Sequence, residues 1–256
     1  MKKFQLMTLL GLFVCVFTFI ACGDDDEDDN NAVTTIGITT NDLVGTWMMP
    51  GAQMSYTFTK ELLTINQWGE ENYKGAYTLK DGVLSYSEVN NKLVLLADKS
   101  VIVVLRNIEE GDLKYDDLDF IGIKQGKNVN ATAKDIEGVW RWPMHGQKDY
   151  NRAGLTVKGN TFDLIITPWG QRYTGTFTYN NGMMKLTIDN GYTSREPGTG
   201  YGSMEGNMDP NTLEAEWSQL DKENWTMQSG DEMFFVANGN EAYGFIVGLP
   251  AIFNKK

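Results

Sequence analysis

The chain has 256 residues and a formal net charge of −12, with 22 Lys and Arg against 34 Asp and Glu. This acidity argues against nucleic-acid binding, which needs a basic footprint, and against direct docking on anionic lipid headgroups. The length allows one large domain or two small ones. The 27 glycines and 12% aromatic residues favour many short strands and turns over helices.

Residues 1–21 are typical of a secretion signal. Lys2 and Lys3 precede an uncharged apolar run, FQLMTLLGLFVCVFTFI, which is too short and wrongly flanked for a membrane span. The run ends in FIAC, which resembles a bacterial lipobox, although Phe19 stands where Leu is usual. The resemblance implies a lipoprotein that is cleaved before Cys22 and carries lipid, such as palmitate, on that cysteine. The alternative is an ordinary signal peptide with a chance cysteine.

Residues 22–38 begin with Cys22 and continue with GDDDEDDNN, a block of like charges that stays solvated and predicts a disordered tether. An acidic run directly after the lipidated cysteine resembles the surface-export signal of Bacteroidetes lipoproteins. That resemblance implies anchoring in the outer membrane, with the protein facing the cell exterior; a plain hydrophilic tether is the alternative. Cys15 lies within the signal, so the mature body has no thiol for a disulfide or for cysteine chemistry.

The rest of the chain contains the same pattern twice. TTNDLVGTW at 39–47 matches TAKDIEGVW at 132–140 in its Asp, Gly and Trp residues. QWGEENYKGAYTLKDGVLSY at 67–86 runs alongside PWGQRYTGTFTYNNGMMKLT at 168–187, with Trp-Gly, Tyr, Gly and turn residues in the same order. Several matched features in one order predict a duplicated domain.

Both halves predict β-structure. Asp81-Gly82 and Asn181-Gly182 each favour a type I′ hairpin turn, and Gly75 and Gly175 inside strand patterns indicate a bulge, a barrel corner or a close backbone approach. No amphipathic helix longer than two turns is apparent. Apolar runs and period-two alternation predict further strands at 54–59, 62–66, 92–97, 100–106, 119–125, 162–167, 183–188, 213–218, 233–237 and 242–247.

About seven antiparallel strands in each half would hide their edges best by closing into a small barrel. Gly-x-Trp before a β-meander, repeated behind a lipobox, resembles the lipocalin-like domains of Bacteroidetes lipoproteins. The resemblance implies an all-β fold with two tandem antiparallel lipocalin-like (calycin-type) barrels, at 39–126 and 133–256, joined by a linker at 127–132. In that family the Trp packs across the closed end of the barrel, a place that Trp47 and Trp140 would take.

No catalytic or metal-binding constellation is apparent in the sequence. His145 is the one histidine, and a histidine metal site needs several. Nothing suggests a Ser–His arrangement, and GTGYGSMEG lacks the Gly-Lys-Ser/Thr ending and the helix of a phosphate loop. Carboxylates are plentiful, but abundance does not identify a glycosidase pair. We therefore predict no enzyme activity, no cofactor and no metal.

Aromatic residues supply the candidate ligand-binding set, which is Trp68, Trp169, Tyr73 and Tyr173. Each of the two tryptophans precedes a Gly near a predicted strand end. Such a Trp could be a flat platform for a sugar ring or an apolar ligand, or it could fold back and plug the barrel mouth. Trp217 alternates with Leu213 and Ala215, which predicts a core position.

The second half is longer because of residues 190–211, which are rich in Gly, Ser, Thr and Pro. They form either a long hairpin loop or a loop that covers a binding surface, so a specific site is expected in the second half.

Two functions remain open. The first is a non-catalytic binding module for a small apolar molecule or a glycan, with an open mouth lined by apolar residues. The second is a structural or interaction subunit of a cell-surface protein complex, with barrels filled by bulky side chains and no small-molecule ligand. In both cases the protein is expected to attach to the membrane through the lipid on Cys22.

Overall fold

The computed structural model describes residues 37–144, 147–195, 208–246 and 249–256, without the side chains at 110 and 147–149. These ranges belong to one compact unit, Asn31–Lys256. The signal segment, Cys22, the acidic tether and His145 lie outside the described residues. Within those ranges no helix has both the length and the apolar character needed to cross a membrane.

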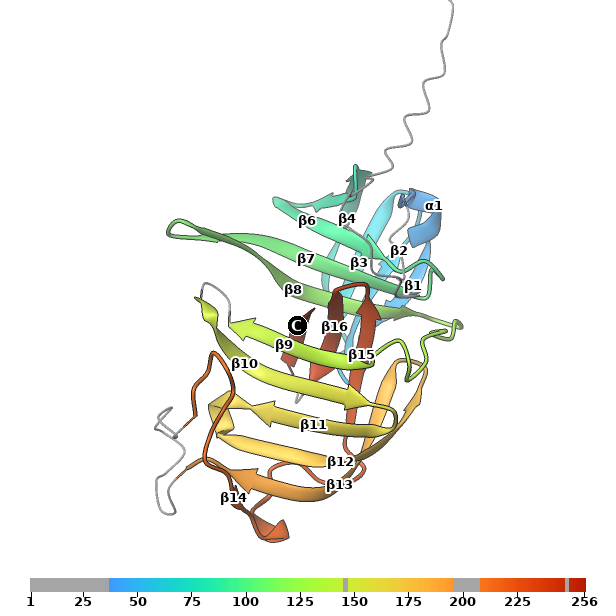
Figure 1. The fold of residues 1–256 in the computed structure, drawn as a ribbon. Coiled ribbons are helices and arrows are strands. Elements are labelled where there is room, and N and C mark those ends of the chain that lie inside the picture. Colours follow the sequence, from blue (N-terminus) through green and yellow to red (C-terminus); the bar gives the residue numbers. More distant parts are fainter. Residues whose placement is uncertain (1–36, 145–146, 196–207, 247–248) are drawn as a thin grey trace, which may run out of the picture. The chain divides into compact units, whose positions relative to one another are not determined.

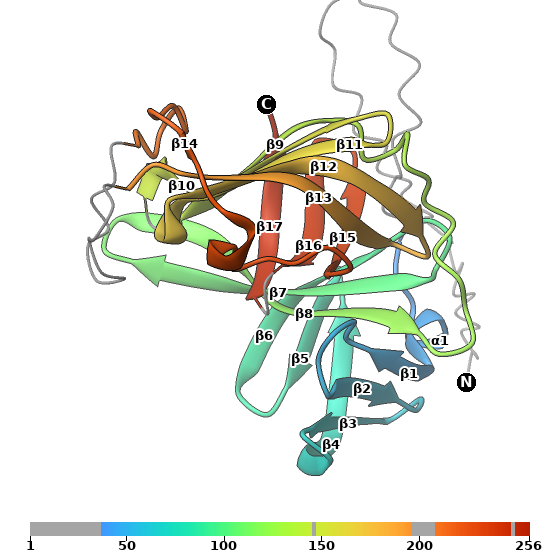
Figure 2. The same cartoon turned by 90° about the horizontal axis from the view of Figure 1, so that it is seen from below.

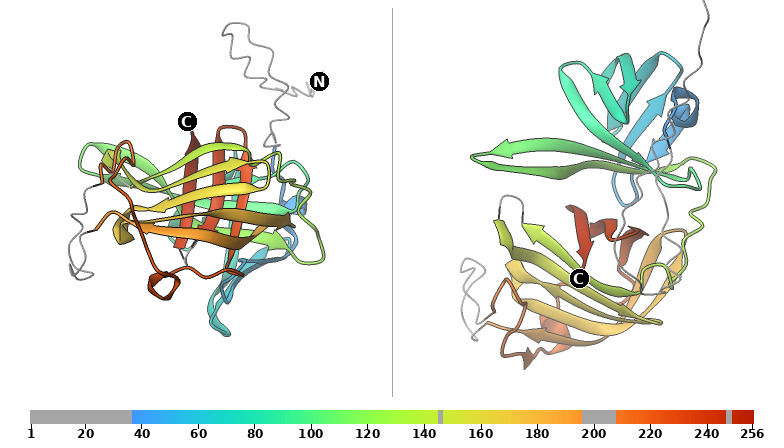
Figure 3. Two further views of the ribbon diagram at one scale, coloured as in Figure 1. Left: turned by 60° about the horizontal axis from the view of Figure 1, so that its bottom comes forward. Right: turned by 45° about the horizontal axis from the view of Figure 1, so that its top comes forward.

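Eight antiparallel strands close the first barrel in chain order, because β1 pairs with both β2 and β8. The β7–β8 hairpin extends beyond the other strands (Figure 3). A short helix, α1 (Thr40–Leu43), precedes the strands, which are β1 (Gly45–Met48), β2 (Met54–Phe58), β3 (Leu62–Gln67), β4 (Glu70–Lys80), β5 (Val83–Tyr86), β6 (Val89–Leu95), β7 (Val101–Glu110) and β8 (Leu113–Lys124).

The second barrel is also closed and antiparallel. Strands β9 to β13 lie side by side in chain order (Figure 1), and β15, β16 and β17 (Figure 2) return the sheet to β9. The short β14 pairs with the edge of β13. The elements are β9 (Gly138–Met144), β10 (Gln147–Lys158), β11 (Thr161–Ile166), η1 (Thr167–Trp169), β12 (Gln171–Asn180), β13 (Met183–Thr193), β14 (Ser218–Gln219), η2 (Lys222–Asn224), β15 (Glu232–Asn238), β16 (Glu241–Ile246) and β17 (Leu249–Lys255).

The predicted all-β fold with two tandem barrels is confirmed. One predicted strand is wrong: residues 213–218 form only an isolated bridge, Ala215 to Met208, and the first residue of β14. Leu213 has a positive φ of 63°, which interrupts an extended strand. Trp217 is half-buried on the outer face of the barrel, so its predicted core position is also wrong.

The tryptophan of the repeated Gly-x-Trp sequence is held in the same way in both barrels. Trp47 and Trp140 are fully buried. The Trp47 Nε1 donates a hydrogen bond to the backbone oxygen of Leu43 at 2.8 Å, and the Trp140 Nε1 donates to that of Ile136 at 2.9 Å. Each indole is thereby fixed to the short helix or turn that precedes its own strand; its packing across the closed end of the barrel stays a prediction.

Both Asx-Gly turns adopt the backbone that their sequence predicts. Asp81 and Gly82 have φ angles of 52° and 76°, and Asn181 and Gly182 have 53° and 78°, as a type I′ turn requires. Gly175 lies at an irregularity in the β12–β13 pairing, where a Cβ would approach the Thr187 carbonyl oxygen at 2.0 Å. Only glycine fits this close approach.

Some strands are buried on both faces. Residues 101–104 of β7 are all fully buried, although alternate side chains of a strand point to opposite faces. One hydrophobic cluster joins these residues and the rest of the first barrel's core to Phe234, Val236 and Tyr243 of the second barrel. A second cluster fills the interior of the second barrel around Trp140 and Phe235.

Candidate functional site

The second barrel has an apolar pocket at the end opposite Trp140. Strand β9 carries Trp140 near its start and Met144 at its end, and Leu249 begins β17, whose last residue Lys255 pairs with Trp140. The pocket has a volume of about 150 Å³ and opens between the Met144 end of β9 and the Leu249 end of β17. It is lined by Trp142, Met144, Tyr150, Arg152, Ile166, Pro168, Trp169 and Leu249.

Trp169 reaches this mouth because of a local turn. Ile166 ends β11, and Pro168 lies within the 3₁₀ turn Thr167–Trp169, where its fixed φ suits the first helical positions. Gly170 follows with a left-handed backbone, φ 60° and ψ 34°, which ends the turn and starts β12. The Trp169 side chain is half-buried and packs against the interior cluster of the second barrel. It therefore forms part of the pocket wall and does not seal the mouth.

Trp142 forms the floor of the pocket. Its side chain is 5% exposed, and its ring centre lies 6.0 Å from that of Phe253. The indole Nε1 is buried and has no hydrogen-bond partner among the described residues. A buried donor without a partner costs about 1–3 kcal/mol. A ligand that presents an acceptor to this nitrogen would recover that cost.

Arg152 provides the positive charge of the lining. Its guanidinium carbon lies 5.7 Å from the centre of the Trp142 ring, within range of a cation–π interaction. The other lining side chains are apolar or aromatic, apart from the Tyr150 hydroxyl. Chemically, the mouth suits an apolar body with a polar or acidic edge.

The first barrel places the matching tryptophan differently. Trp68 lies at the tip of the β3–β4 hairpin with a φ of 57°, and its side chain is 71% exposed. It does not plug the first barrel, and its role as a stacking platform stays a prediction. Tyr73 on β4 is half-buried, with its ring centre 5.2 Å from that of Tyr86 and its hydroxyl bonded to the Ala76 oxygen at 3.1 Å.

Tyr173 is part of the interior of the second barrel. It is fully buried, and its hydroxyl bonds the carboxamide oxygen of Gln171. The same hydroxyl lies 2.8 Å from the Thr226 Oγ1 and accepts the Thr226 backbone N–H at 3.0 Å. Its hydrogen-bonding capacity is used within the protein, so its ring and hydroxyl are not presented to a ligand. The structure thus separates the four candidates and brings only Trp169 to the pocket.

Sequence reasoning missed Trp142, Met144 and Leu249. The signal was present in GVWRWPM, where Trp140 and Trp142 alternate with Arg141 and therefore share the inner face of one strand. The polar sequence QKDYNRAGLTVK also concealed β10, whose bulges near Asn151 bring Tyr150 and Arg152 to the mouth.

No group of three or more His, Cys, Asp or Glu that could hold a metal ion occurs in the described ranges. The chain matches no protein-family model, no curated protein and no solved structure.

Proposed function

We propose that this protein is a lipid-anchored lipoprotein of the outer membrane, facing the cell exterior, whose second barrel binds a small apolar molecule at its mouth. The observation that carries the binding proposal is the aromatic pocket formed by Trp142 and Trp169, with its unpaired indole nitrogen. The pocket volume of about 150 Å³ equals that of an engineered cavity that holds benzene. The buried part of the ligand is therefore about one ring in size.

The anchoring part of the proposal is supported by the lipobox-like FIAC, the acidic run after Cys22 and the resemblance of the repeated barrels to lipocalin-like domains of Bacteroidetes lipoproteins. Several acyl chains on Cys22 would give stable attachment, whereas one chain gives only marginal binding. No enzyme activity is proposed.

The test is native mass spectrometry of the full chain purified in mild detergent from its own cells. We expect a non-covalent adduct that disappears on denaturation. Trp169→Ala removes part of the pocket wall and should weaken ligand affinity about tenfold or more, and so lower adduct occupancy, since burying an aromatic side chain against a ligand is worth about 1.5–3 kcal/mol. Trp68→Ala is the matched control, because this Trp-Gly turn lies in the first barrel and its side chain is exposed.

Two results would contradict the proposal. Wild-type protein without any adduct would show that the mouth is empty in the cell. An adduct of equal occupancy in Trp169→Ala and wild type would place the ligand elsewhere.

The first barrel favours the second candidate function, that of an interaction subunit without a ligand. Its core contains packed aromatic side chains: the rings of Tyr56 and Phe120 stack with centres 4.1 Å apart, and those of Phe58 and Tyr77 meet edge to face with centres 5.2 Å apart. This barrel would act through its exposed hairpins, including Trp68 at the β3–β4 tip. Co-purification of one stoichiometric partner protein that is lost in Trp68→Ala would support this function.

A further inference from the structure

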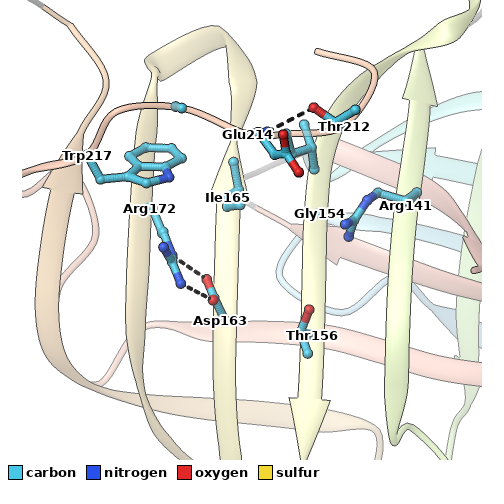
Figure 4. Close-up of a pocket in the computed structure, with 11 residues that line it drawn as sticks. Arg141, Gly154, Thr156, Asp163, Ile165, Arg172, Thr212, Glu214 and Trp217 are labelled. Carbon is cyan, nitrogen blue, oxygen red and sulfur yellow. Dashed lines mark hydrogen bonds and ion pairs between the residues drawn. The ribbon is translucent and has the colours of Figure 1, made fainter. Parts of the chain in front are cut away.

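A second hollow lies on the outer face of the second barrel. It has a volume of about 290 Å³ and lies over strands β9 to β12, beneath residues 208–217 (Figure 4). Its lining residues alternate in sequence with those of the mouth: Arg141 precedes Trp142, and Ile165 precedes Ile166. Neighbouring residues of a strand point to opposite faces, so this outer groove is separate from the mouth and shares no lining residue with it.

Residues 208–217 pack on the outer face of the second barrel and are hydrogen-bonded to it. Leu213 is 3% exposed and sits over Gly154, where a Cβ would approach the Leu213 Cδ1 at 2.4 Å. The Asn151 Nδ2 donates to the backbone oxygens of Pro210 and Asn211, both at 3.0 Å. Leu213 keeps a left-handed backbone that a branched residue avoids, which requires support from these tertiary contacts. The groove therefore has a fixed wall.

One of the two arginines in the groove is already neutralised. Arg172 holds Asp163 in a bidentate pair, with Nε to Oδ1 at 2.9 Å and Nη2 to Oδ2 at 2.5 Å. Arg141 differs, because its hydrogen bond is to the backbone oxygen of Trp140 at 3.1 Å. Within the described ranges no salt bridge joins Arg141 to a carboxylate; partial burial lowers its pKa, and the charge of Asp163 opposes that shift. Arg141 is thus a partly desolvated cation with no carboxylate in direct contact among the described residues.

An aromatic face lies at the other end of the groove. Figure 4 shows Trp217 beside β12 and Arg141 on β9, with the Asp163–Arg172 pair and Thr156 on the floor between them. The Arg172 guanidinium carbon lies 5.9 Å from the centre of the Trp217 ring. Three strand spacings of about 4.8 Å separate β9 from β12. This distance is about 14 Å, which is too long for one ring and suits a ligand of two rings.

We propose that the outer groove binds an acidic saccharide, with the apolar face of one pyranose ring on Trp217 and a carboxylate on Arg141. A guanidinium matches a planar carboxylate with two parallel hydrogen bonds. The Thr156 hydroxyl and the Glu214 carboxylate, which also line the groove, suit the hydroxyls of the sugar. The net charge of −12 repels a polyanion, which favours an isolated carboxylate among neutral hydroxyls.

The test is isothermal titration calorimetry of the full chain with cellobiouronate, the matched neutral sugar cellobiose, and a sulfated cellobiose. We expect cellobiouronate to bind about tenfold or more tightly than cellobiose, as a charge-assisted pair implies. Arg141→Gln should abolish that preference, and Arg141→Lys should retain part of it. Trp217→Ala should weaken both sugars equally. Arg152→Gln, at the mouth, is the matched control and should change neither affinity.

Circular dichroism and thermal melting establish that each variant is folded before titration. The proposal is overturned if neither sugar binds to the wild type, if both bind equally, or if Arg141→Gln keeps the preference. Tighter binding of the sulfated sugar would overturn the carboxylate assignment. Because the outer groove and the mouth share no residue, Trp169→Ala should leave these titrations unchanged, so the two proposals fail independently.

Discussion

Lys124 and Trp47 are direct partners across the seam that closes the first barrel, and the Lys124 Nζ lies 4.9 Å from the centre of the Trp47 ring. Trp47 belongs to the first strand and Lys124 to the last. The second barrel repeats the relationship: Lys255 pairs with Trp140, and its Nζ lies 5.4 Å from that ring. The duplicated sequence therefore encodes a duplicated closure, in which a lysine from the last strand covers the buried tryptophan of the first.

We predict that Trp47→Phe and Trp140→Phe each destabilise the protein by about 1–3 kcal/mol. Each change leaves a buried backbone oxygen, of Leu43 or Ile136, without its indole donor. Urea denaturation followed by circular dichroism measures the effect. Trp68→Phe is the control and should change stability by less than about 0.5 kcal/mol, because that side chain is exposed. The prediction is contradicted if Trp47→Phe and Trp140→Phe both lower the free energy of unfolding by no more than Trp68→Phe does.

Gly175→Ala should cost about 1–3 kcal/mol through overpacking, since its Cβ would meet the backbone oxygen of Thr187 at 2.0 Å. The matched control is Gly75→Ala, at the equivalent place in the first half. There the Cβ would meet the end of the Tyr73 side chain at 2.5 Å, and this half-buried ring can move. Thermal melting of both variants measures the shift in Tm. Equal shifts would show that the close backbone approach at Gly175 does not determine the loss of stability.

The environment of Asp42 predicts that the stability of the protein falls at acid pH. The hydrogen bond from Lys99 at 2.6 Å, followed by those from Thr39, lowers the pKa of Asp42 to about 2. The unfolded chain has the ordinary value of about 3.9, so the folded state binds fewer protons there. The stabilisation is complete above about pH 5 and is lost as the pH falls through about 4 towards 2. The stability difference between wild type and Asp42→Asn should shrink over that range.

The control for this titration is Asp135→Asn in the second barrel. Asp135 caps the equivalent turn through Thr132, with bonds of 2.6 Å and 2.8 Å, but no lysine of the described ranges pairs with it. Comparison of the two variants isolates the part of the acid response that depends on Lys99. If the free energies of unfolding of wild type and Asp42→Asn differ by the same amount at pH 6 and pH 2, the Lys99–Asp42 pair does not contribute.

Cys22→Ala should release the protein from the membrane. The substitution removes the acceptor thiol for the proposed lipid, and the cysteine-free body has no second site. Cell fractionation with immunoblotting should find wild-type protein in the membrane pellet and the Cys22→Ala variant in the soluble fraction. Cys15→Ala is the matched control, because this cysteine lies inside the signal segment and should have no effect. A variant that stays in the pellet would refute the anchor at Cys22.

The hairpins of the fold could be predicted because short sequence patterns specify their turns. Asp81-Gly82 and Asn181-Gly182 require positive φ at two adjacent positions, which restricts the backbone to one kind of hairpin. Gly175 was predicted to mark a bulge, a barrel corner or a close backbone approach because it interrupts a strand pattern, and the structure shows a close approach at an irregularity in strand pairing. The strand expected at 213–218 failed because alternation of Leu213, Ala215 and Trp217 also fits a segment that packs one side chain onto a neighbouring sheet.

The candidate site could be predicted only in part. Trp169 was identified from its place before a glycine, but its repeat partner Trp68 is exposed and Tyr173 is buried. Matched residues in the two halves of the sequence therefore do not have equivalent environments in the structure. A proline and a 3₁₀ turn before Gly170 direct Trp169 to the mouth, whereas Trp68 itself takes a left-handed backbone at the tip of its hairpin.

By itself the sequence determined the β-strand character, the duplication and the hairpin turns, since these depend on short-range spacing and on turn chemistry. Only the tertiary structure decided which side chains share a hollow. Arg141, Asp163 and Trp217 are far apart in the chain, and barrel closure together with the seating of Leu213 on Gly154 places them around one groove. Strand register fixes such neighbours, and register depends on pairing between distant segments that no local pattern encodes.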